Sequence, residues 1–167
     1  SVTYAPNQPT GSLAYTPVAN ANGTATITVT VGDGEAQIST TFNVVVNAVN
    51  DAPVITPVIP SQSVTEDEVF AEISLANYIT DIETPTADIG WVASGTTNIT
   101  VVINQSTRVA KLTRTDPNWN GSETMILTAS DKGDGLAASK SVTQSVKMKV
   151  TPVNEAPTAS DVSAITD

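Results

Sequence analysis

The chain of 167 residues carries 17 acidic and 7 basic side chains, a net charge of −10, and contains neither Cys nor His. The missing residues exclude a disulfide scaffold and thiolate chemistry, and they remove the commonest general base. No Lys or Arg cluster is present to face phosphates, and no apolar run is long enough to span a bilayer. We therefore expect no enzymatic activity, no nucleic-acid binding and no membrane insertion.

The first fifty residues predict an antiparallel β-hairpin. Apolar residues alternate with threonines over 24–31, which is the period-two pattern of a half-buried strand. Gly32-Asp33-Gly34 follows as a tight-turn signal, and a second alternating run over 42–46 gives the return strand. A shorter strand is predicted at 13–15.

The hairpin leads to a segment that occurs twice. Val49-Asn50-Asp51-Ala52-Pro53 returns almost unchanged as Val153-Asn154-Glu155-Ala156-Pro157. Proline has no backbone N–H and a fixed φ, so a central strand does not continue through it. Each copy therefore predicts a junction between modules, with an amide and a carboxylate placed at the joint.

A second hairpin with the same layout precedes the second junction. Gly23 matches Gly121 and Asn50 matches Asn154, so the second copy has gained six residues, either in its turn or in the strand after it. A period of about 100 residues is the size of a sandwich module. We interpret residues 1–52 as the C-terminal part of a truncated module, 53–157 as a complete module, and 158–167 as the start of a following module or linker.

The complete module predicts seven short strands separated by turns. They lie near 63–65, 69–75, 89–93, 98–104, 107–113, 124–130 and 139–151. This number and spacing of strands favours an all-β fold, with Greek-key β-sandwich modules in tandem. The predicted core residues are Ile73, Leu75, Trp91, Leu112, Leu127, Val146 and Met148.

The first module lacks the strands that would complete its sandwich. When the two repeats are aligned, Ser1 corresponds to position 99 of the second. We therefore expect an unprotected sheet edge and an exposed apolar face, with self-association into a homo-oligomer through this truncated module.

Carboxylates in turns predict calcium sites at the junctions. Calcium takes six to eight oxygen ligands, and the loops of a sandwich cluster at its two ends. The predicted ligands at the first junction are Asn50, Asp51, Asp81, Glu83 and Asp131; those at the second are Glu66, Asp67 and Glu68 with Asn154 and Glu155. The alternative is that these residues only form hydrogen bonds to the backbone of their own turns.

The junctions, the Asn-Gly-Thr/Ser lead into a strand and the Gly-Asp-Gly turn resemble cadherin-like (immunoglobulin-like) tandem modules of large bacterial surface adhesins. Cadherins bind Ca²⁺ at module junctions. Carried over, the resemblance implies as ligands Glu66, Asn50 with Asp51, Asp81 with Glu83, and Asp131. This chain departs from the pattern at Asp116-Pro117-Asn118, where cadherins have Asp-Arg-Glu, and at Glu155, which replaces Asp.

The resemblance implies a structural and adhesive repeat module of an extracellular protein, cell-surface or secreted, with Ca²⁺ rigidifying its junctions. Its partners would be the neighbouring modules of the same chain, while the surface protein or glycan ligand is not specified. The alternative is a carbohydrate- or protein-binding accessory module of a secreted enzyme, with Trp91 and Trp119 as sugar-stacking platforms. Intramolecular isopeptide bonds are a further alternative, although the candidate lysines mostly occupy outward-facing positions: Lys111, Lys140, Lys147 and Lys149.

Overall fold

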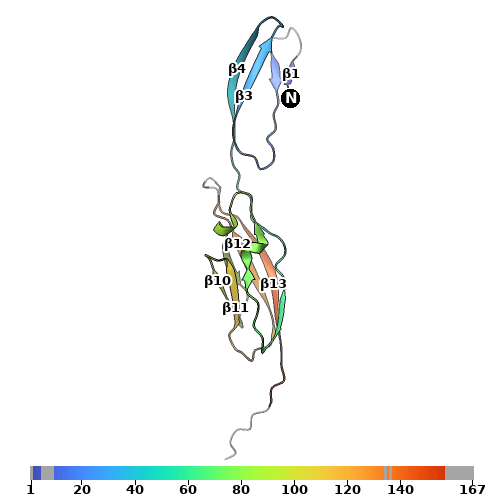
Figure 1. Ribbon diagram of the computed structural model, residues 1–167, viewed down its shortest axis with the longest axis vertical. Helices are drawn as coiled ribbons and strands as arrows, with labels where there is room; N and C mark the ends of the chain where they lie inside the picture. The colour runs from blue at the N-terminus through green and yellow to red at the C-terminus, as the bar shows by residue number, and fades with distance from the viewer. Residues whose placement is uncertain (1, 5–9, 134, 136, 157–167) are drawn as a thin grey trace, which may run out of the picture.

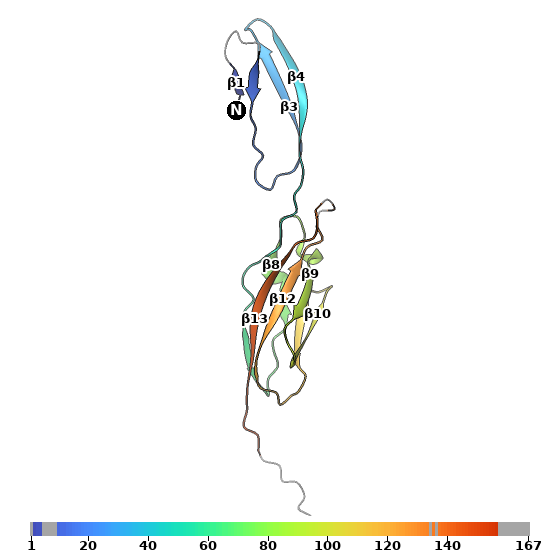
Figure 2. The ribbon, with the colours of Figure 1, turned by 180° about the vertical axis from the view of Figure 1, so that it is seen from behind.

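The chain forms two β-rich lobes placed end to end. Figure 1 shows the hairpin of β3 and β4 beyond one end of a sandwich, joined to it by a single segment of chain. Figure 2 shows the same arrangement from behind. This computed structural model describes residues 2–4, 10–133, 135 and 137–156. The boundary predicted between residues 52 and 53 falls in the segment that joins the lobes, between β4 and β5.

The N-terminal lobe is built on the predicted hairpin. Strand β3 (Gly23–Gly32) pairs with β4 (Gln37–Val46) in antiparallel register along its whole length, and β1 (Val2–Tyr4) pairs with β2 (Gly11–Leu13). The tight turn is closed by Asp33, whose Oδ1 accepts hydrogen bonds from the backbone N–H groups of Glu35 and Ala36. The hairpin prediction is confirmed.

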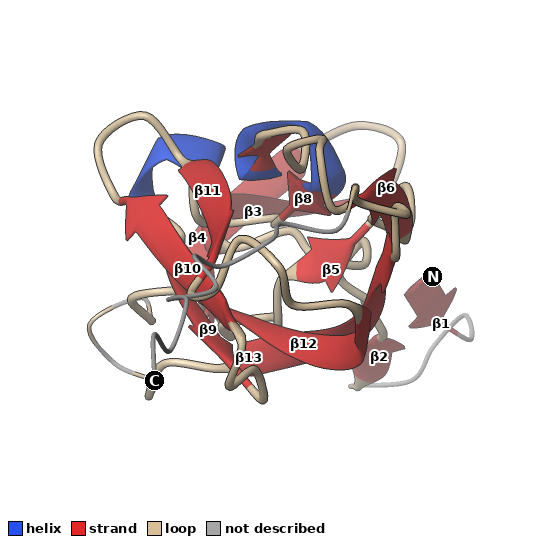
Figure 3. Cartoon of the chain, turned by 90° about the horizontal axis from the view of Figure 1, so that it is seen from below, coloured by secondary structure: helices blue, strands red, loops and turns tan. Residues whose placement is uncertain are grey.

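The C-terminal lobe is a sandwich of two main sheets. Its strands are β5 (Val54–Ile55), β6 (Gln62–Thr65), β7 (Ile73–Ser74), β8 (Ile79–Thr80), β9 (Gly90–Ser94), β10 (Ile99–Asn104), β11 (Val109–Arg114), β12 (Gly121–Ser130) and β13 (Ser141–Thr151). One sheet has the order β6-β13-β12-β9 and the other β10-β11-β7, while β5 pairs with β8. Figure 3, along the long axis, shows β12 and β13 on one side and β11 on the other. Only β6–β13 is parallel among these pairs, and the predicted all-β class is confirmed.

The core lies between these two sheets. All seven predicted core residues belong to it, and each is at most 5 % exposed. Burying a side chain of this size stabilises the fold by about 1.5–3 kcal/mol relative to leaving it in water. Alternation along β12 and β13 therefore predicted the inward face correctly.

The strand predicted over 69–75 is wrong for most of its length. Only Ile73–Ser74 pairs as β7, and the chain then enters a short 3-10 helix, η1 (Leu75–Tyr78). Val69 is 85 % exposed, and both backbone groups of Ala71 bond to the side chain of Gln62 rather than to a strand. Apolar content predicted a strand here, but a side chain satisfies the backbone instead.

The two hairpins differ in their turns and in their burial. Residues 33–36 connect β3 to β4, whereas residues 131–140 connect β12 to β13, so the six extra residues lie in the turn. Ile27 and Val29 are half-buried, while Met125 and Leu127, their counterparts in the repeat, are fully buried. Self-association through the first lobe stays a prediction.

Candidate metal site at the first junction

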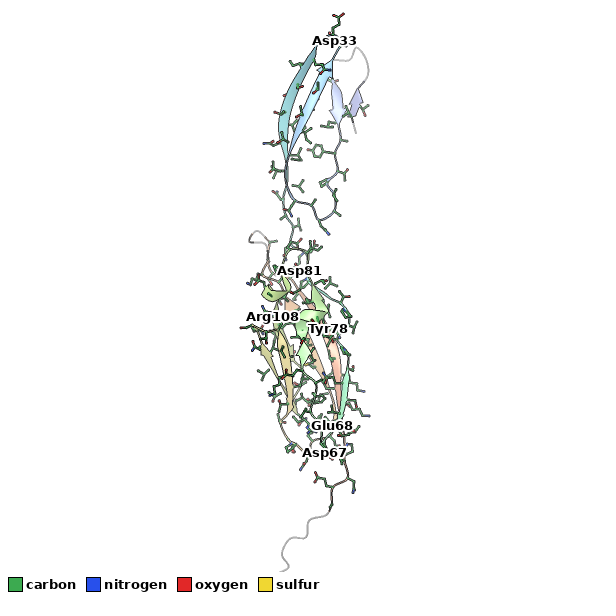
Figure 4. All side chains as sticks on the ribbon, viewed as in Figure 1. Asp33, Asp67, Glu68, Tyr78, Asp81 and Arg108 are labelled. Carbon is green, nitrogen blue, oxygen red and sulfur yellow. The ribbon has the colours of Figure 1, made fainter. Side chains whose placement is uncertain are left out.

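The predicted metal ligands fall at the two ends of the sandwich. Figure 4 shows Asp81 at the end that faces the hairpin lobe, and Asp67 and Glu68 at the opposite end. The first group therefore lies where the connecting segment enters the sandwich, and the second lies where the chain leaves it.

Asn50 is the centre of the first group. It is 0 % exposed, in a segment whose neighbours are largely in solvent. Its Nδ2 donates to Asp131 Oδ2 at 3.1 Å and to the carbonyl oxygen of Ala138 at 3.2 Å. Its Oδ1 is buried and has no hydrogen-bond partner. A buried polar atom of this kind normally has a partner, since leaving it without one costs about 1–3 kcal/mol.

Asp81 carries a second buried oxygen without a partner. It begins the turn after β8, and its Oδ1 accepts hydrogen bonds from the N–H groups of Glu83 at 3.0 Å and Thr84 at 2.7 Å. These bonds hold the carboxylate in one orientation, and its Oδ2 is left buried and unpartnered. Glu83 Oε2 accepts from the N–H of Asp51 at 3.1 Å, which ties the junction to this turn.

Asp131 is a buried carboxylate at the end of β12, 4 % exposed. Its Oδ1 accepts from the N–H groups of Gly133 at 2.8 Å and Lys140 at 2.9 Å. Burial acts to raise the pKa of this group, but these hydrogen bonds, the Asn50 amide and the Lys140 charge together lower the pKa below its ordinary value. Asp131 is therefore held ionised beside Asn50.

The sequence did not assign Lys140 to this site. Its ammonium Nζ donates to the backbone carbonyl oxygen of Asn50 at 2.5 Å. The alternation pattern placed Lys140 outward, and the signal available was its position at the end of the lengthened turn. The carbonyl oxygen of Ala138 comes from the same turn.

The arrangement places amide, carboxylate and backbone oxygens around one joint, and such a donor set fits a hard cation. Asn50, Asp81, Glu83 and Asp131 bring side-chain oxygens to it, and Asp51 joins the group through its backbone N–H, which donates to Glu83. Within the part of the chain that the structure describes, no group of three or more Asp, Glu, His or Cys side chains is placed to hold a metal ion. The argument for a cation therefore depends on the two unpartnered oxygens, one of which belongs to an amide.

The second group is organised differently. Glu66 Oε1 accepts from the N–H of Val153 at 2.5 Å, which ties the end of β13 to the end of β6. The guanidinium of Arg114 donates to the carbonyl oxygens of Thr65 and Glu66. The sequence did not predict that Arg114 lies beside Glu66, where it provides positive charge at this end of the sandwich.

The remaining members of the second group stay near the surface. Glu68 Oε2 accepts from the N–H of Thr65 at 2.9 Å, and Asp67 is exposed. Asn154 and Glu155 are exposed as well. The structure thus joins Glu66 to the linker backbone but does not gather the other predicted side chains around it.

The two tryptophans and Tyr78 of the sandwich are used in packing. Trp91 is buried at 2 % exposure, and Tyr78 and Trp119 pack against the core. Sugar-stacking surfaces require exposed aromatic faces, so these residues give no specific support to the carbohydrate-binding alternative.

Comparison with known proteins places the fold. No family model matches the chain, and a search of curated proteins finds no match. Among solved structures, Drosophila N-cadherin EC1-4 is similar, with a TM-score of 0.52 and 23 % identity over 77 % of this chain. An endo-fucoidan hydrolase of glycoside hydrolase family 107 matches with a TM-score of 0.46 and 20 % identity over 83 % of the chain.

The chain spans 31 % of the cadherin structure and 20 % of the hydrolase. No helix among the described residues has the length and apolar character needed to cross a membrane. At these identities the likeness concerns the fold alone. The chain has an all-β, cadherin-like sandwich fold.

Proposed function

We propose that this chain is a structural and adhesive repeat module of a large extracellular surface protein, and that Ca²⁺ rigidifies its first junction. The observation that carries the proposal is the pair of buried, unpartnered oxygens, Asn50 Oδ1 and Asp81 Oδ2, where the two lobes meet. One belongs to the connecting segment and the other to a turn of the sandwich, so a cation bound to both would fix the joint.

The residues that would hold the ion are those already gathered there: Asn50, Asp51, Asp81, Glu83 and Asp131. A divalent cation would supply the positive charge that relieves repulsion among these carboxylates. The protein supplies the orientation, because Asp81 and Asp131 are each fixed by backbone hydrogen bonds from their own turns. Neighbouring modules of the same chain are the partners, and stiff joints would hold them in line.

Calcium titration tests the proposal. Extracellular modules bind Ca²⁺ with dissociation constants of about 10⁻⁴–10⁻³ M. At ten times that constant, binding stabilises the folded state by about 1.4 kcal/mol, so the melting temperature rises above its value in chelator. Small-angle scattering should show a longer, less variable particle with calcium. Unchanged melting and scattering up to 10 mM Ca²⁺ (about ten times the weaker constant) would contradict the proposal.

A pair of variants localises the effect. Asp81→Asn keeps an Oδ1 acceptor for its turn but replaces the unpartnered oxygen by an NH₂ group, and it should abolish the calcium response. Asp88→Asn is the matched control. It removes the same charge from an exposed carboxylate that is paired with Lys132, and the calcium response should be retained.

A further inference from the structure

Lys140 is an exposed residue whose ammonium is bonded to the connecting segment at the junction. Its ammonium lies 2.5 Å from the carbonyl oxygen of Asn50, on the connecting segment between the lobes. Its own N–H donates to Asp131 Oδ1, and its charge contributes to the lowered pKa of Asp131. One residue of the long turn therefore contacts both halves of the Asn50–Asp131 pair.

The other lysine of this turn shows how unusual that position is. Lys132 forms an ion pair with Asp88 at 3.1 Å, and both side chains are at least half exposed. An exposed pair of this kind contributes little to stability. Lys140 is exposed as well, but it directs its charge to a backbone oxygen of Asn50, which is fully buried. The opposite end of the sandwich uses the same device, since Arg114 donates to the carbonyl oxygens of Thr65 and Glu66.

We infer that Lys140 is the built-in counter-cation of the first junction: its ammonium holds the connecting segment when no divalent ion is bound, and it weakens the binding of such an ion. The second half of this inference rests on the proposed calcium site. An ammonium beside Asn50 repels a divalent ion that binds Asn50 Oδ1, because the two positive charges share one partly buried joint. The lysine thus keeps the joint ordered in the metal-free state and raises the calcium concentration needed to replace it.

The test uses the whole chain with Lys140→Met, which keeps the apolar stem and removes the charge. The first readout is hydrogen exchange of the Asp51 N–H, which is bonded to Glu83, in chelator. We expect this exchange to become about tenfold faster in Lys140→Met. The second readout is calorimetric titration with CaCl₂, where we expect Lys140→Met to bind calcium about tenfold more tightly than the wild type.

Two further variants serve as controls. Lys132→Met removes the same charge from the same turn and should leave both readouts at their wild-type values. Lys140→Arg restores a cation and should restore slow exchange in chelator. Unchanged melting of the sandwich in each variant shows that the lobe itself is folded.

The outcomes separate the two proposals. Wild-type exchange of Asp51 in Lys140→Met would overturn the inference, and so would calcium that binds the wild type and binds Lys140→Met no more tightly. Faster exchange in Lys140→Met, with no calcium binding by any variant, would overturn the calcium proposal while supporting the role of the lysine in the metal-free joint.

Discussion

The side-chain amide of Gln144 pairs with both backbone groups of Ile59: its Oε1 accepts from the Ile59 N–H at 3.0 Å and its Nε2 donates to the Ile59 carbonyl oxygen at 2.8 Å. Two other glutamines do the same, Gln62 with Ala71 and Gln105 with Trp91. Each amide supplies one donor and one acceptor, as a neighbouring strand would. The sandwich therefore uses side-chain amides to satisfy backbone groups that its strand ladders leave unpaired.

Replacing this amide should destabilise the sandwich. Gln144→Glu has nearly the same shape, but at neutral pH it lacks the donor and sets a negative charge against the Ile59 carbonyl oxygen. We expect a loss of about 1–3 kcal/mol in the free energy of unfolding, measured in urea. Gln37→Glu, at an exposed position on β4, adds the same charge and should change stability by less than about 0.5 kcal/mol. Equal effects of the two substitutions would disprove a specific role for the Gln144 amide.

These glutamines also mark what the sequence does not disclose. Alternation reports which face of a strand is buried, so it predicted both hairpins and the core residues of β12 and β13. The partner of Gln144 is 85 residues away along the chain, and only the tertiary fold brings the two together. The short length of β7 follows from such a contact, between Gln62 and Ala71, and so the strand predicted there was too long.

The candidate site, like the fold, was predicted from the sequence only in part. Repeat junctions and turn carboxylates were enough to group Asn50 with Asp81, Glu83 and Asp131, since sandwich loops meet at two ends. Lys140 was missed because alternation describes strands and says nothing of where a long turn returns. The orphaned oxygens of Asn50 and Asp81 are properties of packing, which no spacing in the sequence specifies.

Glu123 should make the stability of the sandwich depend on pH. Its Oε1 accepts from Asn98 N at 2.9 Å and Asn98 Nδ2 at 2.8 Å, and its carboxylate also accepts from the N–H groups of Thr97 and Ile99. Burial acts to raise the pKa of Glu123, but these hydrogen bonds lower the pKa below its ordinary value of 4.5. A lowered folded-state pKa means that the stabilisation is complete above pH 4.5 and is lost as the pH falls through the folded-state pKa.

Glu123→Gln tests this dependence. It should cost about 2 kcal/mol at neutral pH, where the carboxylate is ionised and accepts several hydrogen bonds. The difference from the wild type should shrink as the pH is lowered towards 3, because the wild-type side chain becomes protonated. Unfolding free energies measured from pH 3 to pH 7 check both points. Glu72→Gln, at an exposed carboxylate, should show neither effect, and a pH-independent difference for Glu123→Gln would refute the assignment.

Equivalent positions of the two hairpins should respond differently to truncation. Leu127 is 0 % exposed, so Leu127→Ala should cost about 2–5 kcal/mol through lost burial and the cavity that remains. Its counterpart Val29 is only half-buried. Both tryptophans of the chain lie in the sandwich, so tryptophan fluorescence follows the unfolding of that lobe alone. Leu127→Ala should shift the fluorescence transition and Val29→Ala should not; a shift in both would mean that the lobes unfold as one unit.

The apolar face of the first hairpin should make the chain associate with a second copy. Val31 and Ile38 are paired across β3 and β4, and both are exposed, Ile38 at 75 %. Covering such a face removes apolar surface from water, which favours association. We expect the sedimentation coefficient to rise with protein concentration, and Ile38→Lys to suppress that rise. Thr41→Lys places the same charge on the same strand but on the opposite face, and it should leave association intact. Loss of association in both variants would indicate pairing along the strand edge or general charge repulsion, and a wild-type chain that stays monomeric at all concentrations would rule out this interface.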